Sequence, residues 1–105
     1  MVIQMVKVKS QLSDDEVRKV MQNRAPQFRA LSGLVQKYYG YEDSTGMHTG
    51  IYIWDSEESM REFAESELAK TIPEAYQVET QPRVEIFEMI FPLRESRESV
   101  GTAAE

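Results

Sequence analysis

The stretch Leu34–Asp55, LVQKYYGYEDSTGMHTGIYIWD, decides the fold. Leu34–Glu42 and Met47–Asp55 are rich in aromatic and β-branched residues, which favour strands. The residues DSTG, at positions 43–46, lie between them, and a short connection that contains glycine is typical of a hairpin. This stretch therefore predicts two neighbouring antiparallel strands.

Two further strands flank this hairpin in the sequence. In Met1–Lys9 every second side chain falls on the same side, as the two-residue period of a strand requires. Arg83–Phe91, RVEIFEMIF, predicts the last strand, and Pro92 closes it. Thr71–Gln81, which contains one proline and precedes another, predicts a connection without regular structure.

A first helix is predicted between the first strand and the hairpin. Ser13 and Glu16 have the spacing of a capping box, which indicates a helix from about Asp14 to Arg24. Proline disfavours helical backbone at the residue before it, so Pro26 predicts a break followed by a short helical turn over residues 26–31.

A second helix follows the hairpin. Asp55 and Glu58 give a second capping signature, and an apolar stripe at helical spacing runs over Met60–Leu68. The order β-α-β-β-α-β predicts a ferredoxin-like α+β fold, with a four-stranded antiparallel sheet and two helices on one face. Residues 1–95 form this one domain, and the polar tail 96–105 is expected to be disordered.

Both faces of the predicted sheet are apolar, which points to a second copy of the chain. On the third strand, Ile51 and Ile53 alternate with Tyr52 and Trp54. A bare aromatic face would exceed the exposed apolar patch of an ordinary monomer, so we expect two sheets packed face to face in a homodimeric α/β barrel. The aliphatic pair suits the helix layer, which assigns Tyr52 and Trp54 to the side covered by the second copy.

Charge and composition exclude several classes of partner. Residues 1–54 carry seven basic and five acidic side chains, whereas residues 55–105 carry five and thirteen. Binding to phosphate backbones needs clustered Lys and Arg, so neither nucleic acid nor an anionic membrane is an expected partner. There is no cysteine, and His48 is the one histidine in the chain, so no metal site is expected. No apolar run could span a bilayer and no secretory signal is visible, which predicts a cytoplasmic protein.

Three segments resemble a known family. They are GLVQK at residues 33–37, TGIYIWDS at 49–56 and EIFEMIFPL at 85–93. The chain resembles the YdhR-type mono-oxygenases of the dimeric α/β-barrel superfamily over roughly residues 3–93. The resemblance implies a homodimer, an apolar cavity and oxidation of a small aromatic molecule without a cofactor.

One feature of related haem-degrading proteins is only half present. They carry a tryptophan at the end of the third strand, which Trp54 matches, and a helical histidine that ligates iron about ten residues later. Ala64 occupies that place here, so haem is not expected as an obligate cofactor.

Three polar side chains are the predicted catalytic residues. His48 and Tyr52 share one side of the third strand, and a histidine can act as a base near neutral pH, so together they could deprotonate a phenol or enol. Lys37 stands inside an aromatic strand, where it could orient a carboxylate or an enolate oxygen. The alternatives are a packing role for Tyr52 and surface positions for His48 and Lys37. Arg24, beside the predicted helix break, is expected at the surface.

The aromatic wall of the site is predicted to bind the substrate. It comprises Trp54, Tyr38, Tyr39 and Phe87. The resulting hypothesis is a cofactor-independent mono-oxygenase that acts on a small aromatic, phenolic or quinol-type molecule. A non-redox cyclase or isomerase using the same acid–base groups, and a small-molecule-binding module without chemistry, are the alternatives.

Overall fold

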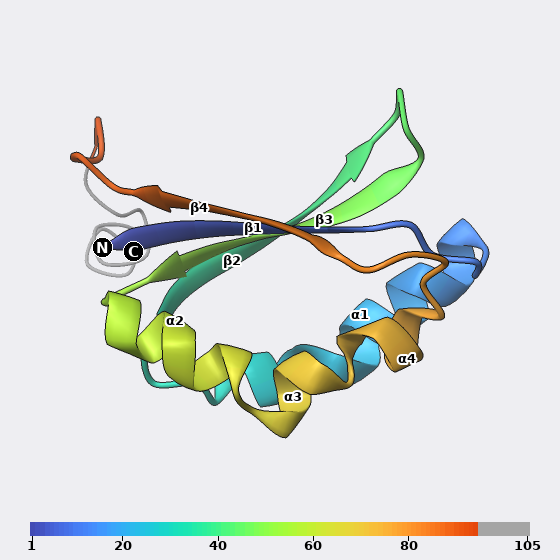
Figure 1. Cartoon of the computed structure of the whole chain (residues 1–105), viewed down its shortest axis with the longest axis horizontal. Coiled ribbons are helices and arrows are strands. Elements are labelled where there is room, and N and C mark those ends of the chain that lie inside the picture. Colours follow the sequence, from blue (N-terminus) through green and yellow to red (C-terminus); the bar gives the residue numbers. More distant parts are fainter. Residues whose placement is uncertain (95–105) are drawn as a thin grey trace, which may run out of the picture.

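The computed structural model describes residues 1–94, and the tail predicted to be disordered, residues 96–105, lies outside this range. The strands pair antiparallel in the order β2-β3-β1-β4, and the helices gather on one side of the sheet (Figure 1). This is the predicted ferredoxin-like α+β fold. The elements are β1 (Val2–Val8), α1 (Asp14–Arg29), β2 (Leu34–Glu42), β3 (Met47–Trp54), α2 (Glu57–Ala64), α3 (Glu67–Lys70), α4 (Ile72–Tyr76) and β4 (Arg83–Glu88).

The first helix is longer than predicted. The Ser13–Glu16 capping box is formed as expected, but α1 continues through Pro26 to Arg29. The predicted break is therefore wrong. A proline inside a helix loses one backbone hydrogen bond. Burial of Phe28, the next-to-last residue of the helix, holds the last turn against the sheet despite that loss.

The second predicted helix is divided into α2 and α3, and a further helix, α4, follows them. Ser56 caps α2 by accepting a hydrogen bond from the backbone N–H of Ser59, so Ser56 and not Asp55 is the cap. Ser66 caps α3 in the same way. Pro73 stands in the first turn of α4, where its missing N–H costs nothing, so the segment predicted as an irregular connection begins with a helix.

The last strand ends three residues earlier than predicted. β4 pairs with β1, and the backbone N–H of Met89 donates to the carbonyl of Met1 at 3.0 Å. The paired register of the two strands ends at Val2 and Glu88. The apolar side chains that follow, Ile90, Phe91 and Leu93, are 90%, 72% and 88% exposed.

The helix layer covers the aromatic side of β3 and not the aliphatic side. Tyr52 and Trp54 are 2% and 1% exposed, and they contact Phe28 of α1 and Phe63 of α2. The expectation that a second copy covers this side is therefore wrong. Both sides of the strand are apolar, so periodicity could not choose between them. The large rings offer the greater apolar area to bury against Phe28 and Phe63.

The opposite side of the sheet has no helix over it (Figure 1). The register places Ile51 and Ile53 of β3 on this side, opposite Met5 and Ile3 of β1. All four side chains are half-buried. We refer to this surface as the open face. Its most exposed aromatic side chains are Tyr38 and Phe87, which are 56% and 47% exposed.

Gly33 holds the loop before β2 close to α2. A Cβ atom at Gly33 would lie 2.3 Å from Oγ and 2.4 Å from Cβ of Ser59. Gly33→Ala is therefore expected to lower the free energy of unfolding by about 1–3 kcal/mol, measured by urea denaturation. Gly40→Ala is the control, because its Cβ would meet nothing closer than Thr49 at 4.0 Å. Equal losses in the two variants would contradict the close approach.

Candidate functional site

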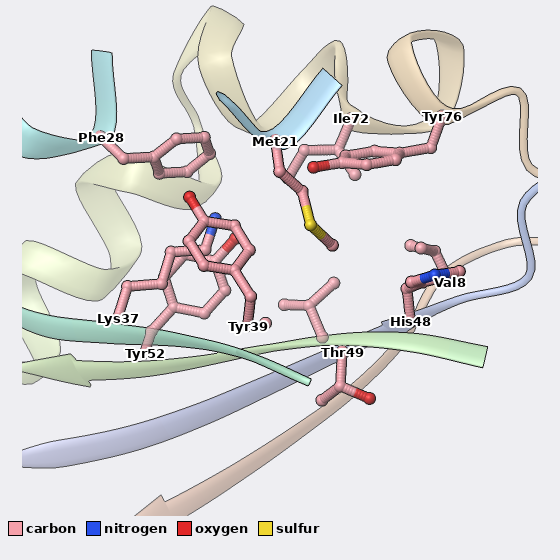
Figure 2. A pocket seen from close by; sticks show the side chains of 12 residues that line it. Val8, Met21, Phe28, Lys37, Tyr39, His48, Thr49, Tyr52, Ile72 and Tyr76 are labelled. Carbon is pink, nitrogen blue, oxygen red and sulfur yellow. The ribbon is translucent and has the colours of Figure 1, made fainter. Parts of the chain in front are cut away.

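A small cavity of about 30 Å³ lies between the sheet and the helix layer. Figure 2 shows side chains of β2 and β3 rising towards those of α1 and α4. The cavity is largely apolar, and its polar members come from distant parts of the sequence. Its lining residues are Val6, Val8, Met21, Phe28, Lys37, Tyr39, His48, Thr49, Gly50, Tyr52, Ile72 and Tyr76.

A wider groove of about 370 Å³ adjoins the cavity between α1 and β2. Phe28, Lys37 and Tyr39 line both spaces, so they form the boundary between them. The other lining residues of the groove are Ala25, Arg29, Leu34, Val35 and Gln36. The groove has room for a small aromatic molecule, whereas the cavity has room for about one water-sized molecule.

Lys37 stands among aromatic rings and has no acidic partner among residues 1–94. Its Nζ lies 3.5 Å from the centre of the Phe28 ring and 4.5 Å from the centres of the Tyr39 and Tyr52 rings. Burial, and secondarily the charge of Arg24, lower the pKa of Lys37 to about 7. The amine therefore exchanges a proton near neutral pH. This confirms that Lys37 points inwards, one of the two positions that its sequence context allowed.

Arg24 lies inside the helix layer and not at the surface as predicted. Its Nη2 donates to the carbonyl of Leu68 at 2.7 Å and to Oγ1 of Thr71 at 3.2 Å, both beyond the end of α2. Its Nε is buried without a hydrogen-bond partner among the residues that the structure describes. These bonds fix a positive charge close enough to lower the pKa of Lys37. Local sequence patterns could not indicate this position, because the acceptors lie on a separate helix and at its end.

His48 is held by a carboxylate that sequence reasoning missed. Its Nε2 lies 3.2 Å from Oδ1 of Asp14, the first residue of α1. With Nε2–H donating to this carboxylate, Nδ1 carries a lone pair; Nδ1 is buried and has no partner within residues 1–94. A hydrogen bond from Arg18, followed by one from His48, lowers the pKa of Asp14. The pair is thus an imidazole oriented by a carboxylate, which is the arrangement of a general base.

Two tyrosine hydroxyls complete the polar lining. Burial raises the pKa of Tyr52 well above its usual range and that of Tyr76 to about 12. Both stay protonated at neutral pH and can donate a hydrogen bond to a ligand. Tyr76 belongs to α4, the helix that the sequence did not predict, so its place in the site came from the structure alone.

Three of the predicted aromatic residues lie elsewhere. Trp54 does not line the cavity: its ring stacks on Tyr52, and its Nε1 donates to Oε1 of Gln4 at 2.9 Å, which makes it a core residue. Tyr38 and Phe87 belong to the open face, on the other side of the sheet. The structure therefore brings together His48, Lys37, Tyr52 and Tyr39, and it separates Trp54, Tyr38 and Phe87 from them.

Neither a metal centre nor a membrane span is found in the described part of the chain. Residues 1–94 hold no cluster of three or more His, Cys, Asp or Glu side chains that could bind a metal ion. None of the helices in the same range is long and apolar enough to cross a membrane.

Solved structures share this fold. A "putative antibiotic biosynthesis monooxygenase" from Deinococcus radiodurans superposes with a TM-score of 0.70 at 16% identity, covering 91% of this chain and 99% of that one. SnoaB from Streptomyces nogalater, a cofactor-independent oxygenase, superposes with a TM-score of 0.71 at 17% identity. The match covers 90% of this chain and 97% of SnoaB. NE2512 from Nitrosomonas europaea, a protein of unknown function, superposes with a TM-score of 0.73 at 11% identity, and the match covers 90% of this chain and 94% of NE2512.

The chain thus has the α+β fold found in monooxygenase-type proteins. This confirms the resemblance to a mono-oxygenase family at the level of fold. The sequence matches no family model and no curated protein. At these identities the comparisons establish the architecture, and the chemistry has to be argued from the site itself.

Proposed function

We propose that this protein is a cofactor-independent mono-oxygenase that acts on a small phenolic or quinol-type molecule. One observation carries the proposal: the free Nδ1 of an Asp14-oriented His48 and the Nζ of Lys37 belong to the lining of one internal aromatic cavity. A base and a cation on the same apolar space suit removal of a proton from a phenol and stabilisation of the oxyanion that results. The fold shared with SnoaB supports this choice among the acid–base reactions that the site allows.

The proposed reaction begins with the aromatic ring in the groove and its hydroxyl directed past Lys37 into the cavity, where one water-sized molecule passes the phenol proton to Nδ1 of His48. The phenolate oxygen stays at the boundary of the two spaces, near Lys37 and the hydroxyl of Tyr52, which stabilise its negative charge. The ionised ring is rich in electrons at the carbon opposite the oxygen. The substrate itself therefore supplies the electrons that a cofactor would otherwise provide.

The oxygen step balances without another reductant. The ring carbanion gives one electron to O₂, and the superoxide and ring radical combine to form a C–O bond. The peroxide takes a proton from His48, and loss of water across the C–H bond leaves a carbonyl. In sum, a phenol and O₂ yield a quinone and water: one oxygen atom enters the product and the other is reduced.

Oxygen uptake by the purified protein with a panel of hydroquinones and phenols tests the proposal. We expect uptake above a protein-free blank, and a loss of about 10²–10⁴-fold in kcat for His48→Ala. Turnover that continues without O₂ would favour a cyclase or isomerase instead. Tight binding with no turnover in any condition would favour a binding module, and either result overturns the mono-oxygenase.

Asp14 is proposed as a positioning residue for His48. Asp14→Asn keeps a hydrogen-bonding oxygen but removes the charge that favours the Nε2–H tautomer. We expect a loss in kcat that is smaller than the loss on removal of the base, which costs about 10²–10⁴-fold, with KM unchanged. Asp15→Asn, on the next residue, is the matched control. A kcat for Asp14→Asn equal to that of the parent protein would contradict the role.

We also propose that two copies of the chain pair through the open face. Ile51, Ile53 and Phe87 lie on a side of the sheet that no helix covers, and the exposed segment after β4 adds further apolar area. A monomer that exposed all of this would carry an unusually large apolar surface. Removing several hundred Å² of such surface from water at about 25 cal/mol per Å² would offset part of the cost of association.

Sedimentation of Phe87→Glu tests this pairing. A charge on the open face is expected to raise the dimer dissociation constant by about 30-fold or more. Ile86→Glu is the control, since Ile86 is similarly exposed on the same strand but points to the helix side. A parent protein that sediments as a monomer at micromolar concentration would rule out the dimer.

A further inference from the structure

We propose that the groove between α1 and β2 binds its aromatic ligand as an oxyanion, with Lys37 at its inner end and Arg29 at its mouth. This deepens the proposed function, on which it rests only for the identification of the ligand as aromatic. The ligand chemistry is an aromatic ring that carries a negatively charged oxygen, either a phenolate or a carboxylate.

The charges around the groove carry the argument. Among residues 1–94, the two charged residues in its lining, Lys37 and Arg29, are basic, and none of the lining residues in this range is Asp or Glu. Arg24 adds a third positive charge behind Lys37, held on the carbonyl of Leu68. This concentration of positive charge stands out in a chain whose net charge is −6. An anion entering the groove would therefore meet attraction from several sides and repulsion from none of its lining residues.

The unpartnered amine indicates where the oxyanion would sit. The surroundings of Lys37 supply ring faces, which attract a cation, but no hydrogen-bond acceptor within residues 1–94. The titratable and charged groups near it are Arg24 of α1, Tyr39 of β2, Tyr52 of β3 and Tyr76 of α4. None of them is anionic at neutral pH. A half-buried ammonium that faces aromatic rings without an acceptor is costly, so a ligand oxyanion at Nζ would supply the hydrogen-bond acceptor that residues 1–94 do not.

The rest of the groove suits a ring. Phe28 and Tyr39 present aromatic faces, and Leu34, Val35 and Ala25 make its apolar side. Figure 2 shows Lys37 and Tyr39 rising from the sheet towards Phe28, so a ring that enters along the apolar side reaches the amine with its polar end. An aliphatic anion would gain the charge contact but lose the contact with these faces.

Binding of 4-nitrophenol, followed by its absorption, is the first test because the phenol and the phenolate absorb at different wavelengths. We expect the bound probe to ionise at a lower pH than the free probe. Lys37→Met should remove this shift, whereas Lys7→Met, on the open face and paired with Glu42, should leave it in place. A probe that binds with an unchanged or raised pKa, or fails to bind at millimolar concentration, overturns the oxyanion site.

Benzoate and benzamide, which have similar shapes, provide the second arm. By calorimetry we expect benzoate to bind about ten-fold or more tightly than benzamide, and we expect Arg29→Gln to reduce this preference and Lys37→Met to abolish it. Benzoate binding should take up protons from the buffer, since the carboxylate stabilises protonated Lys37. A phenol can donate its own proton to Lys37, so phenol binding should take up fewer protons from the buffer than benzoate binding does. Equal affinities of benzoate and benzamide would contradict a carboxylate ligand.

These binding measurements are independent of turnover. If the oxygenase proposal fails because no substrate consumes O₂, the preference for an anionic ring remains measurable. If O₂ uptake is found while 4-nitrophenol binds as the neutral phenol and benzoate gains nothing over benzamide, the anion site fails and the oxygenase stands.

Discussion

At pH 7 the free energy of unfolding of Lys37→Met is expected to be about 2–4 kcal/mol higher than that of the parent protein. Burial lowers the pKa of Lys37 from 10.5 to about 7, so the folded protein bears a penalty whenever this amine is charged. Contacts with Phe28, Tyr39 and Tyr52 offset part of that penalty, which is why the expected gain is smaller than the full pKa change implies. Methionine fills a similar volume without the charge.

The stabilisation has a definite pH dependence. Below about pH 7 Lys37 is protonated in both the folded and unfolded chains, and the penalty is present in full. Between about pH 7 and 10.5 the unfolded chain binds more protons at this position than the folded chain, so the stability of the parent protein gains from rising pH. The difference between Lys37→Met and the parent should therefore shrink across that window and vanish above it.

Urea denaturation of both proteins at several pH values between 6 and about 10 measures this difference. Lys7→Met is the control, because Lys7 forms an ion pair with Glu42 on the open face. We expect it to change stability little and without this pH dependence. A Lys37→Met variant that is less stable than the parent at pH 7, or a difference that stays constant with pH, would show that the amine is not penalised. A costly lysine beside a cavity is a candidate functional residue.

Trp54→Ala is expected to lower the free energy of unfolding by about 3–5 kcal/mol. Trp54 is 1% exposed. Its ring stacks on that of Tyr52, with the ring centres 5.8 Å apart, and its centre lies 5.2 Å from that of the Phe63 ring. Alanine would remove these contacts and leave a cavity at the centre of the core. Small domains have about 5–15 kcal/mol of stability in total, so a large fraction of the variant is expected to be unfolded at 37 °C.

Trp54→Phe separates the packing of Trp54 from its hydrogen bond. Phenylalanine keeps an aromatic ring but leaves Oε1 of Gln4 without the donor that lies 2.9 Å away in the parent. We expect a loss of about 1–3 kcal/mol by circular dichroism melting, with ligand binding preserved in the folded protein. Loss of 4-nitrophenol binding in folded Trp54→Phe would instead place Trp54 in the site.

The two variants bear on different parts of the same face of the sheet. Trp54 is buried with its Nε1 hydrogen-bonded to Gln4, whereas Lys37 is half-buried and its Nζ faces aromatic rings. Aromatic sequence context alone made both positions candidates for the site. Burial and hydrogen bonding distinguish them: a satisfied aromatic side chain supports the fold, and an unsatisfied cation is available to a ligand.

Much of the fold could be predicted because its signals are local. The strand Leu34–Glu42 was predicted with the bounds that the structure has, and its partner Met47–Trp54 to within one residue, since each depends on residue types in a short window. The Ser13–Glu16 capping box spans only four residues. The helix through Pro26 and the early end of β4 were missed, because burial of Phe28 and the extent of pairing with β1 decide them, and neither is visible in a short window.

By itself, the sequence determined the order of the elements, the hairpin and the presence of an unusual lysine among aromatic side chains. The tertiary structure alone decided which side of the sheet is buried by helices, and with it that Lys37, His48 and Tyr52 share an internal cavity while Phe87 does not. It also supplied Asp14 and Arg24, whose partners His48 and Leu68 lie 34 and 44 residues away. Alternation in a strand fixes which side chains point the same way, but only packing against another element fixes which of the two sides is inside.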